Sequence, residues 1–111
     1  MRASARSRVE RHAQAALAAL APALRLTVAW TLHPIQGSGP DVYAEAFTWG
    51  RDAVILLDEI TFERCTPDER EDTIRHEIAH LLAWDLHGHE IEDHGPEFRR
   101  ARIDLDMALE S

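Results

Sequence analysis

The chain has 111 residues, 45% of them hydrophobic, which is enough for one domain with a single core and no disulfide support. Its 20 acidic and 12 basic residues give a net charge of -8, so long-range attraction of the whole domain to nucleic acid or to an anionic membrane is disfavoured. The single cysteine, Cys65, excludes an intrachain disulfide and a multi-cysteine zinc ribbon, and it favours a reducing, cytoplasmic setting.

The first segment predicts an amphipathic helix from about Ala5 to Leu20 that stops near Pro22. Its apolar residues recur at helical spacing, at Val9, Ala13, Leu17, Leu20 and Leu24. The arginines and the alanine-rich run also resemble a signal peptide, but polar residues between positions 10 and 14 argue against that alternative. No run of 18 or more apolar residues occurs, so we expect no membrane span.

Three later segments have the patterns of β-strands. Residues 24–30 alternate apolar and other side chains, residues 43–49 place Phe47 and Trp49 on one face, and residues 53–57 form a continuous apolar run. Residues 33–40 are rich in glycine and proline and predict a loop. A tight connection at residues 50–52 predicts a hairpin between the last two strands.

Two helices are expected in the second half. Thr66 can cap the first of them, Pro67 suits its first position, and Glu69 completes a capping box. This helix should end near Gly88, which is free to adopt the left-handed conformation. A final helix begins at about Pro96, and its apolar residues share one side: Phe98, Ala101, Leu105, Ala108 and Leu109. We therefore expect an α+β fold with an N-terminal helix, a small three-stranded antiparallel or mixed sheet, and two further helices.

An HExxH pattern, His76-Glu77-Ile78-Ala79-His80, lies in the middle of the helix expected from Pro67. Histidines four residues apart stand on one face of a helix, with Cβ atoms about 5 to 6 Å apart, and can bind one zinc ion together. Glu77 then lies beside the metal, where a carboxylate can accept the proton of a zinc-bound water. The pattern indicates hydrolysis of a peptide bond rather than a purely structural site, although so short a motif also arises by chance.

A catalytic zinc ion usually has three protein ligands and an open fourth position. The metzincin pattern is disfavoured, because Leu86 occupies the place of its third histidine and Ala83 the place of its glycine. The remaining candidates for the third ligand are His87, His89, His94, Glu90, Glu92, Asp93 and Glu97.

The combination of HExxH with His94-Gly95-Pro96-Glu97-Phe98 resembles the SprT-like family of zinc metalloproteases, which includes the Spartan proteases that cut proteins crosslinked to DNA. The order of strand, hairpin, strand and acidic helix before HExxH is also similar, so the resemblance covers about residues 42–102. It implies a zincin-like fold and a single metalloprotease domain over residues 1–111. It further implies that His76, His80 and His94 bind one Zn²⁺ and that Glu77 is the catalytic base of an endopeptidase.

The resemblance also implies protein or peptide substrates, and DNA as a partner, although the net charge disfavours DNA. We expect an extended substrate to pair with the strand at residues 53–57. No cysteine-rich zinc ribbon and no C-terminal interaction tail follow the motif, as we expect of a minimal catalytic domain. The alternative function is a non-proteolytic zinc-binding module that binds DNA or a protein partner, and a second is a zinc hydrolase of small molecules or peptides. Two groups of arginines are either solvated helix faces or phosphate contacts: Arg2, Arg6, Arg8 and Arg11, and Arg99, Arg100 and Arg102.

Several other residues near the motif have two interpretations. His87 and His89 are either exposed turn residues, or one of them lines the cleft and stabilises the oxyanion. Tyr43 either packs in the ordinary way or serves that oxyanion role. Trp84 is expected to pack and to shield the metal site, and Glu97 either complements the helix dipole or supports a ligating histidine.

Overall fold

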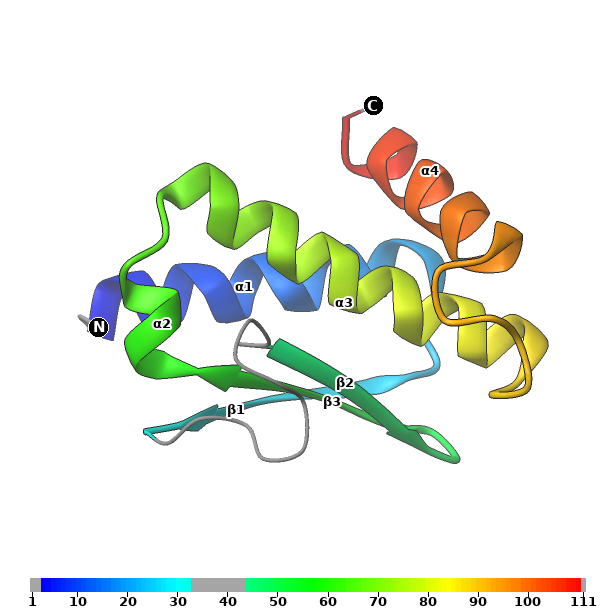
Figure 1. Ribbon diagram of the computed structural model, residues 1–111, viewed down its shortest axis with the longest axis horizontal. Helices are drawn as coiled ribbons and strands as arrows, with labels where there is room; N and C mark the ends of the chain where they lie inside the picture. Colours follow the sequence, from blue (N-terminus) through cyan, green and yellow to red (C-terminus); the bar gives the residue numbers. More distant parts are fainter. Residues whose placement is uncertain (1–2, 33–43, 111) are drawn as a thin grey trace.

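Residues 3–32 and 44–110 are described by the computed structural model of this chain, and they surround one hydrophobic core (Figure 1). The elements are α1 (Ala3–Leu20), β1 (Arg25–Thr31), β2 (Ala44–Trp49), β3 (Asp52–Asp58), α2 (Glu59–Glu63), α3 (Pro67–His87) and α4 (Pro96–Glu110). This order confirms the α+β fold class with an N-terminal helix and a small sheet. Tyr43 and the loop expected at residues 33–40 lie outside the described residues.

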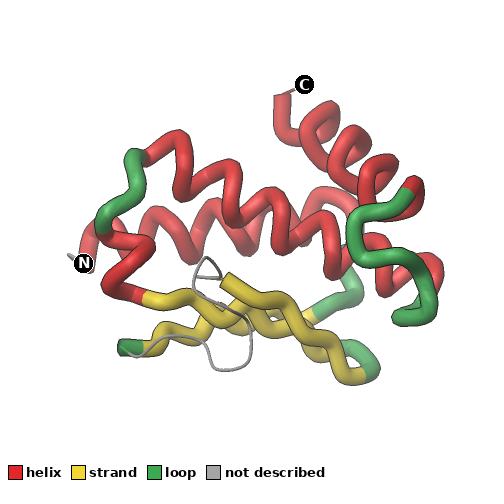
Figure 2. Tube along the Cα trace, viewed as in Figure 1, coloured by secondary structure: helices red, strands yellow, loops and turns green. Residues whose placement is uncertain are grey.

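The sheet is mixed, with the strand order β1-β3-β2 (Figures 1 and 2). β3 pairs with β1 in parallel and with β2 in an antiparallel hairpin, which confirms the hairpin and places Gly50 in its turn at φ 55°. The expectation that a substrate adds to residues 53–57 is wrong, because β3 is the central strand and is paired on both sides. Among the described strands, the free edges belong to β1 and β2.

Helices α1 and α3 lie over one face of the sheet, and α4 packs against α3 (Figure 1). Each layer contributes fully buried side chains to the core: Leu17, Ile55, Leu57, Ile78, Leu81 and Leu105. Phe98, Ala101 and Leu109 also face inward from α4, as its apolar periodicity predicts. Within the described residues, no helix has the length and apolar character needed to cross a membrane.

Helix α3 begins and ends where the sequence predicts. The Thr66 hydroxyl accepts a hydrogen bond from the Glu69 amide at 3.2 Å, and the Glu69 carboxylate accepts one from the Thr66 amide at 2.9 Å. The helix stops at Gly88, whose φ of 82° is positive as expected. Its ψ of -179° differs from the left-handed helical value and lies in a region that is essentially restricted to glycine.

Helix α2 was not predicted from the sequence. Asp58 caps it, since its carboxylate accepts hydrogen bonds from the amides of Ile60 at 3.1 Å and Thr61 at 3.3 Å. Phe62 on this helix is fully buried and meets Trp30 edge-on, with 5.9 Å between ring centroids. The short helix therefore carries the chain from the end of β3 to the start of α3 while closing one side of the core.

A network of ion pairs fixes α4 on α3. The Arg75 guanidinium lies 3.0 Å from the Asp106 carboxylate, and Arg102 bonds to Asp106 at 3.0 Å and to Asp72 at 2.7 Å. Burial by itself raises the pKa of Asp106, but the hydrogen bonds from Arg102 and Arg75 outweigh it and hold the pKa below its usual value of 3.8. The carboxylate is therefore ionised and shared between two guanidinium groups at neutral pH.

We expect Asp106→Asn to lower the free energy of unfolding by about 1 to 2 kcal/mol at pH 7, because both guanidinium groups lose this carboxylate. The folded-state pKa lies below the unfolded value, so the stabilisation is complete at neutral pH and is lost as the pH falls through the lowered pKa. Urea denaturation measures the change. Asp104→Asn is the matched control, because Asp104 pairs at the surface with Arg100 and should cost less than about 0.5 kcal/mol. Equal losses in the two variants would contradict a stabilising network.

Candidate metal centre

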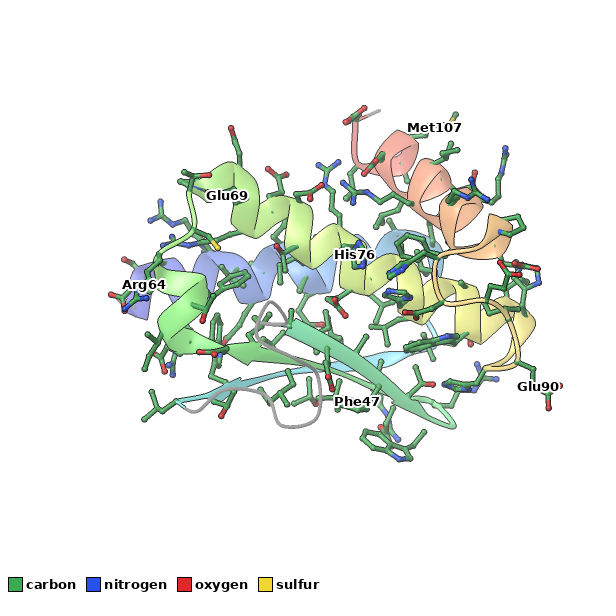
Figure 3. All side chains as sticks on the ribbon, in the orientation of Figure 1. Phe47, Arg64, Glu69, His76, Glu90 and Met107 are labelled. Carbon is green, nitrogen blue, oxygen red and sulfur yellow. The ribbon has the colours of Figure 1, made fainter. Side chains whose placement is uncertain are left out.

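His76, labelled on α3 in Figure 3, and His80 project one turn apart from the same face of that helix. His94 meets them from the loop before α4. The Nε2 atom of His76 lies 3.3 Å from Nε2 of His80 and 3.2 Å from Nε2 of His94. One ring nitrogen of each histidine falls within 4.8 Å of the other two. The structure therefore brings together three of the histidines singled out in the sequence, and the other candidates for a third ligand are not part of this group.

The spacing of these nitrogens fits a tetrahedral metal ion. Two nitrogens bound to one Zn²⁺ at 2.0 to 2.1 Å, at the tetrahedral angle, lie about 3.3 to 3.4 Å apart. Burial and the neighbouring His94 lower the pKa of His76, and burial and the neighbouring His76 lower the pKa of His80 to about 4. Both rings are thus neutral at pH 7 and present a lone pair. The three histidines could hold a metal ion, and their nitrogen donors suit zinc.

The residues after His94 explain how the third imidazole reaches the site. A Cβ added at Gly95 would lie 2.8 Å from the Cβ of Glu92, so the loop closes tightly only with glycine at this position. Phe98, in the first turn of α4, is 7% exposed and packs against all three imidazoles, with ring centroids 4.4 to 5.1 Å apart. The sequence predicted Phe98 as a core residue of α4, but not this contact beneath the histidines.

Asp93 lies beside two of the three histidines. One of its carboxylate oxygens is 3.7 Å from Nδ1 of His80, and the other is 3.8 Å from Nδ1 of His94. These distances exceed hydrogen-bond lengths. They still place a negative charge next to Nδ1 of His80 and of His94, the ring nitrogens that face away from the point where the three Nε2 atoms converge. A carboxylate in this place orients ligating imidazoles. The sequence indicates Asp93 only as a candidate ligand.

The three histidines line a cleft of about 480 Å³ between α3, β2 and the loop that precedes α4. Glu77 lines the same cleft and is 8% exposed. Burial raises the pKa of Glu77 to about 7, and the nearby carboxylates of Glu45 and Asp93 add to the rise. A carboxyl group with this proton affinity, next to a metal position, fits the role of a general base.

His89 is exposed but makes two contacts that were not predicted. Its Nε2 lies 2.8 Å from the hydroxyl of Thr48 in β2, and its ring stacks on Trp84 with 4.9 Å between centroids. Trp84 in turn stacks on His80 at 5.3 Å, consistent with the expectation that it shields the metal position. His87 is exposed at the last position of α3. Sequence reasoning could not have paired His89 with Thr48, because the two are far apart along the chain.

A comparison with protein families matched residues 6–108, nearly the whole chain, to the SprT-like family. The match extends on both sides of residues 42–102, which carry the resemblance in the sequence. No curated protein and no solved structure matched the chain significantly.

We expect the protein to bind one Zn²⁺ per chain, and His94→Ala to bind it at least about 100-fold more weakly, because one of three nitrogen donors is lost. Competition with a chromophoric chelator measures the affinity. His87→Ala is the control, since this exposed histidine lies outside the group and its loss should leave zinc binding unchanged. Unaltered zinc affinity of His94→Ala would remove His94 from the site.

We also expect Glu77→Gln to stabilise the metal-free protein at pH 8, by an amount on the order of 2 kcal/mol. The folded-state pKa of Glu77 lies above its usual value of 4.5, so between pH 4.5 and about 7 the folded chain keeps a proton that the unfolded chain has lost. Stability therefore falls between pH 4.5 and about 7 in the wild type, and the variant avoids this cost. Denaturation of chelator-treated samples at pH 4.5 and pH 8 measures the difference. Glu90→Gln, at an exposed position, should show no pH-dependent gain in stability. If Glu77→Gln is no more stable than the wild type at pH 8, the raised pKa of Glu77 is contradicted.

Proposed function

This chain belongs to the SprT-like family of metalloprotease-type domains, and from that premise we propose that it is a zinc-dependent endopeptidase that hydrolyses peptide bonds. Three imidazole nitrogens converge beside the buried Glu77 carboxyl in one cleft, and this convergence is the observation that carries the proposal. In the proposed enzyme, His76, His80 and His94 hold one Zn²⁺, and Glu77 is the catalytic base.

A zinc ion held by these residues would activate a water molecule and polarise the carbonyl group of the substrate. Glu77 accepts the proton of the attacking water and then delivers it to the nitrogen of the leaving amine, so the carboxylate is regenerated. Its raised pKa supports both transfers near neutral pH. Phe98 holds the three imidazoles from below, which keeps the ligands in place during the reaction.

β2 supplies the edge on which an extended substrate can lie. Residues 44–46 line the cleft, and β2 has a strand neighbour on one side only among the described strands. A peptide that adds to this edge forms main-chain hydrogen bonds with β2, and its side chains alternate between the two faces of the sheet. On the face away from α3, they would lie beside Phe47 and Trp49, which stack at 6.0 Å and are 36% and 61% exposed.

The proposal requires no DNA. Arg6 pairs with Glu59 and lies 4.9 Å from the ring of Trp30, while Arg102 pairs with Asp72 and with Asp106 of its own helix. For Arg6 and Arg102, these contacts favour a place on the helix faces of the domain over phosphate contacts. We therefore propose that proteins or peptides are the substrates, and that single-stranded DNA is an additive whose effect on cleavage is to be measured.

At equal zinc content, Glu77→Gln should lower kcat/KM for casein and for unstructured peptides by at least about 100-fold, because the attacking water loses its base. Cleavage is measured with and without single-stranded DNA, and Glu90→Gln serves as the control for the same chemical change at an exposed site. Undiminished cleavage by Glu77→Gln would remove Glu77 from the reaction. Stoichiometric zinc with no cleavage of any substrate would favour the non-proteolytic zinc-binding module instead.

A further inference from the structure

A side-chain bridge joins the two walls of the metal cleft. The hydroxyl of Thr48, in the strand whose residues 44–46 line the cleft, lies 2.8 Å from Nε2 of His89. His89 belongs to the segment between α3 and α4, which also carries the metal-site histidine His94. The bridge therefore connects edge strand β2 to the chain reversal that delivers the third imidazole.

His89 also belongs to a stack of rings that ends at the metal site. His89 stacks on Trp84 with planes 26° apart, and Trp84 stacks on His80 with planes 23° apart. Trp84 lines the metal cleft and, with Thr48 and His89, a second small cavity of about 180 Å³. A continuous path of contacts thus runs from β2 through His89 and Trp84 to the imidazole of His80.

We propose that His89 is a positioning residue, which sets β2 against the three-histidine site through its hydrogen bond to Thr48 and its stacking on Trp84. The inference rests on the proposed function in one respect, namely that a substrate lies along the free edge of β2. A strand bound there reaches the metal position only if β2 is held at a fixed separation from α3 and from the segment after it. The bridge provides that constraint at the end of the cleft nearer the β2–β3 turn.

The test compares Thr48→Val, His89→Ala and the double variant with two controls, His87→Ala and Thr27→Val. Val preserves the shape of Thr48 and removes its hydroxyl, and both control side chains are exposed and lie outside the bridge. Zinc affinity is measured by chelator competition, ligand geometry by the visible absorption spectrum of the Co²⁺-loaded protein, and KM and kcat with a peptide substrate. Unfolding midpoints of all variants are measured alongside.

We expect His89→Ala to weaken zinc binding about tenfold and to change the Co²⁺ spectrum, since partners outside the ligand set tune metal affinity by this order. Thr48→Val should raise KM about 2- to 10-fold with a smaller effect on kcat, as loss of one hydrogen bond predicts. Thr48→Ser, which keeps the hydroxyl, should have the wild-type KM. In the double variant, the effects of Thr48→Val and His89→Ala on KM should not add, because both substitutions break the same hydrogen bond.

The inference is overturned if His89→Ala and Thr48→Val match the two controls in zinc affinity, Co²⁺ spectrum and KM. It is also overturned if their effects on KM simply add. If the wild-type protein cleaves nothing, the proposed protease function fails. The zinc affinity and the Co²⁺ spectrum then still decide whether His89 positions the three-histidine site.

Discussion

Convergence of three imidazole nitrogens, two from α3 and one from the loop before α4, is the constraint on which the rest of this structure depends. α3 alone can present only two of them, because the third must return from a chain reversal with Nε2 about 3.2 Å from that of His76. Several contacts hold α4 for this purpose: Phe98 beneath the rings, Leu105 in the core and Asp106 between two guanidinium groups. These contacts lie along more than two turns of α4, so the helix cannot pivot about any one of them without disturbing the others.

The helical part of the site could be predicted from sequence because its signals are local. The capping box at Thr66 fixes where α3 begins, and HExxH then places two histidines on one face by helical periodicity alone. The order of the strands could not be predicted in the same way. The apolar run at residues 53–57 is typical of a strand buried on both faces, and β3 does lie centrally, but its parallel pairing with β1 depends on a non-local contact. Helix α2 has only 5 residues, too few for an apolar period to be recognised.

The residues that contact the histidines also differ in whether a local sequence pattern predicts them. Phe98 had a local signal, because the apolar periodicity of α4 places it on the buried face of that helix, four residues after His94. Asp93 and His89 had none. Their roles follow from neighbours that only the folded chain provides, Nδ1 of His80 for Asp93 and the Thr48 hydroxyl for His89. Polar residues of a loop carry little information about which side chains they contact. The contacts of Asp93 and His89 can therefore be identified only from the structure.

Glu77 shows how function and stability are linked at this site. Its carboxyl is buried, Glu45 and Asp93 raise its pKa further, and no arginine is among the described residues that line the cleft. In the metal-free fold an ionised carboxylate at this position therefore costs free energy. A divalent cation among the three imidazoles would reverse the sign of the local field, and it would favour the ionised form of Glu77, the form that the proposed mechanism requires. The same ion would stabilise the folded chain over the unfolded one, because only the folded chain gathers these ligands. Folding, metal binding and the proton affinity of Glu77 would then be one coupled equilibrium, in which a bound metal offsets the cost of burying this carboxyl.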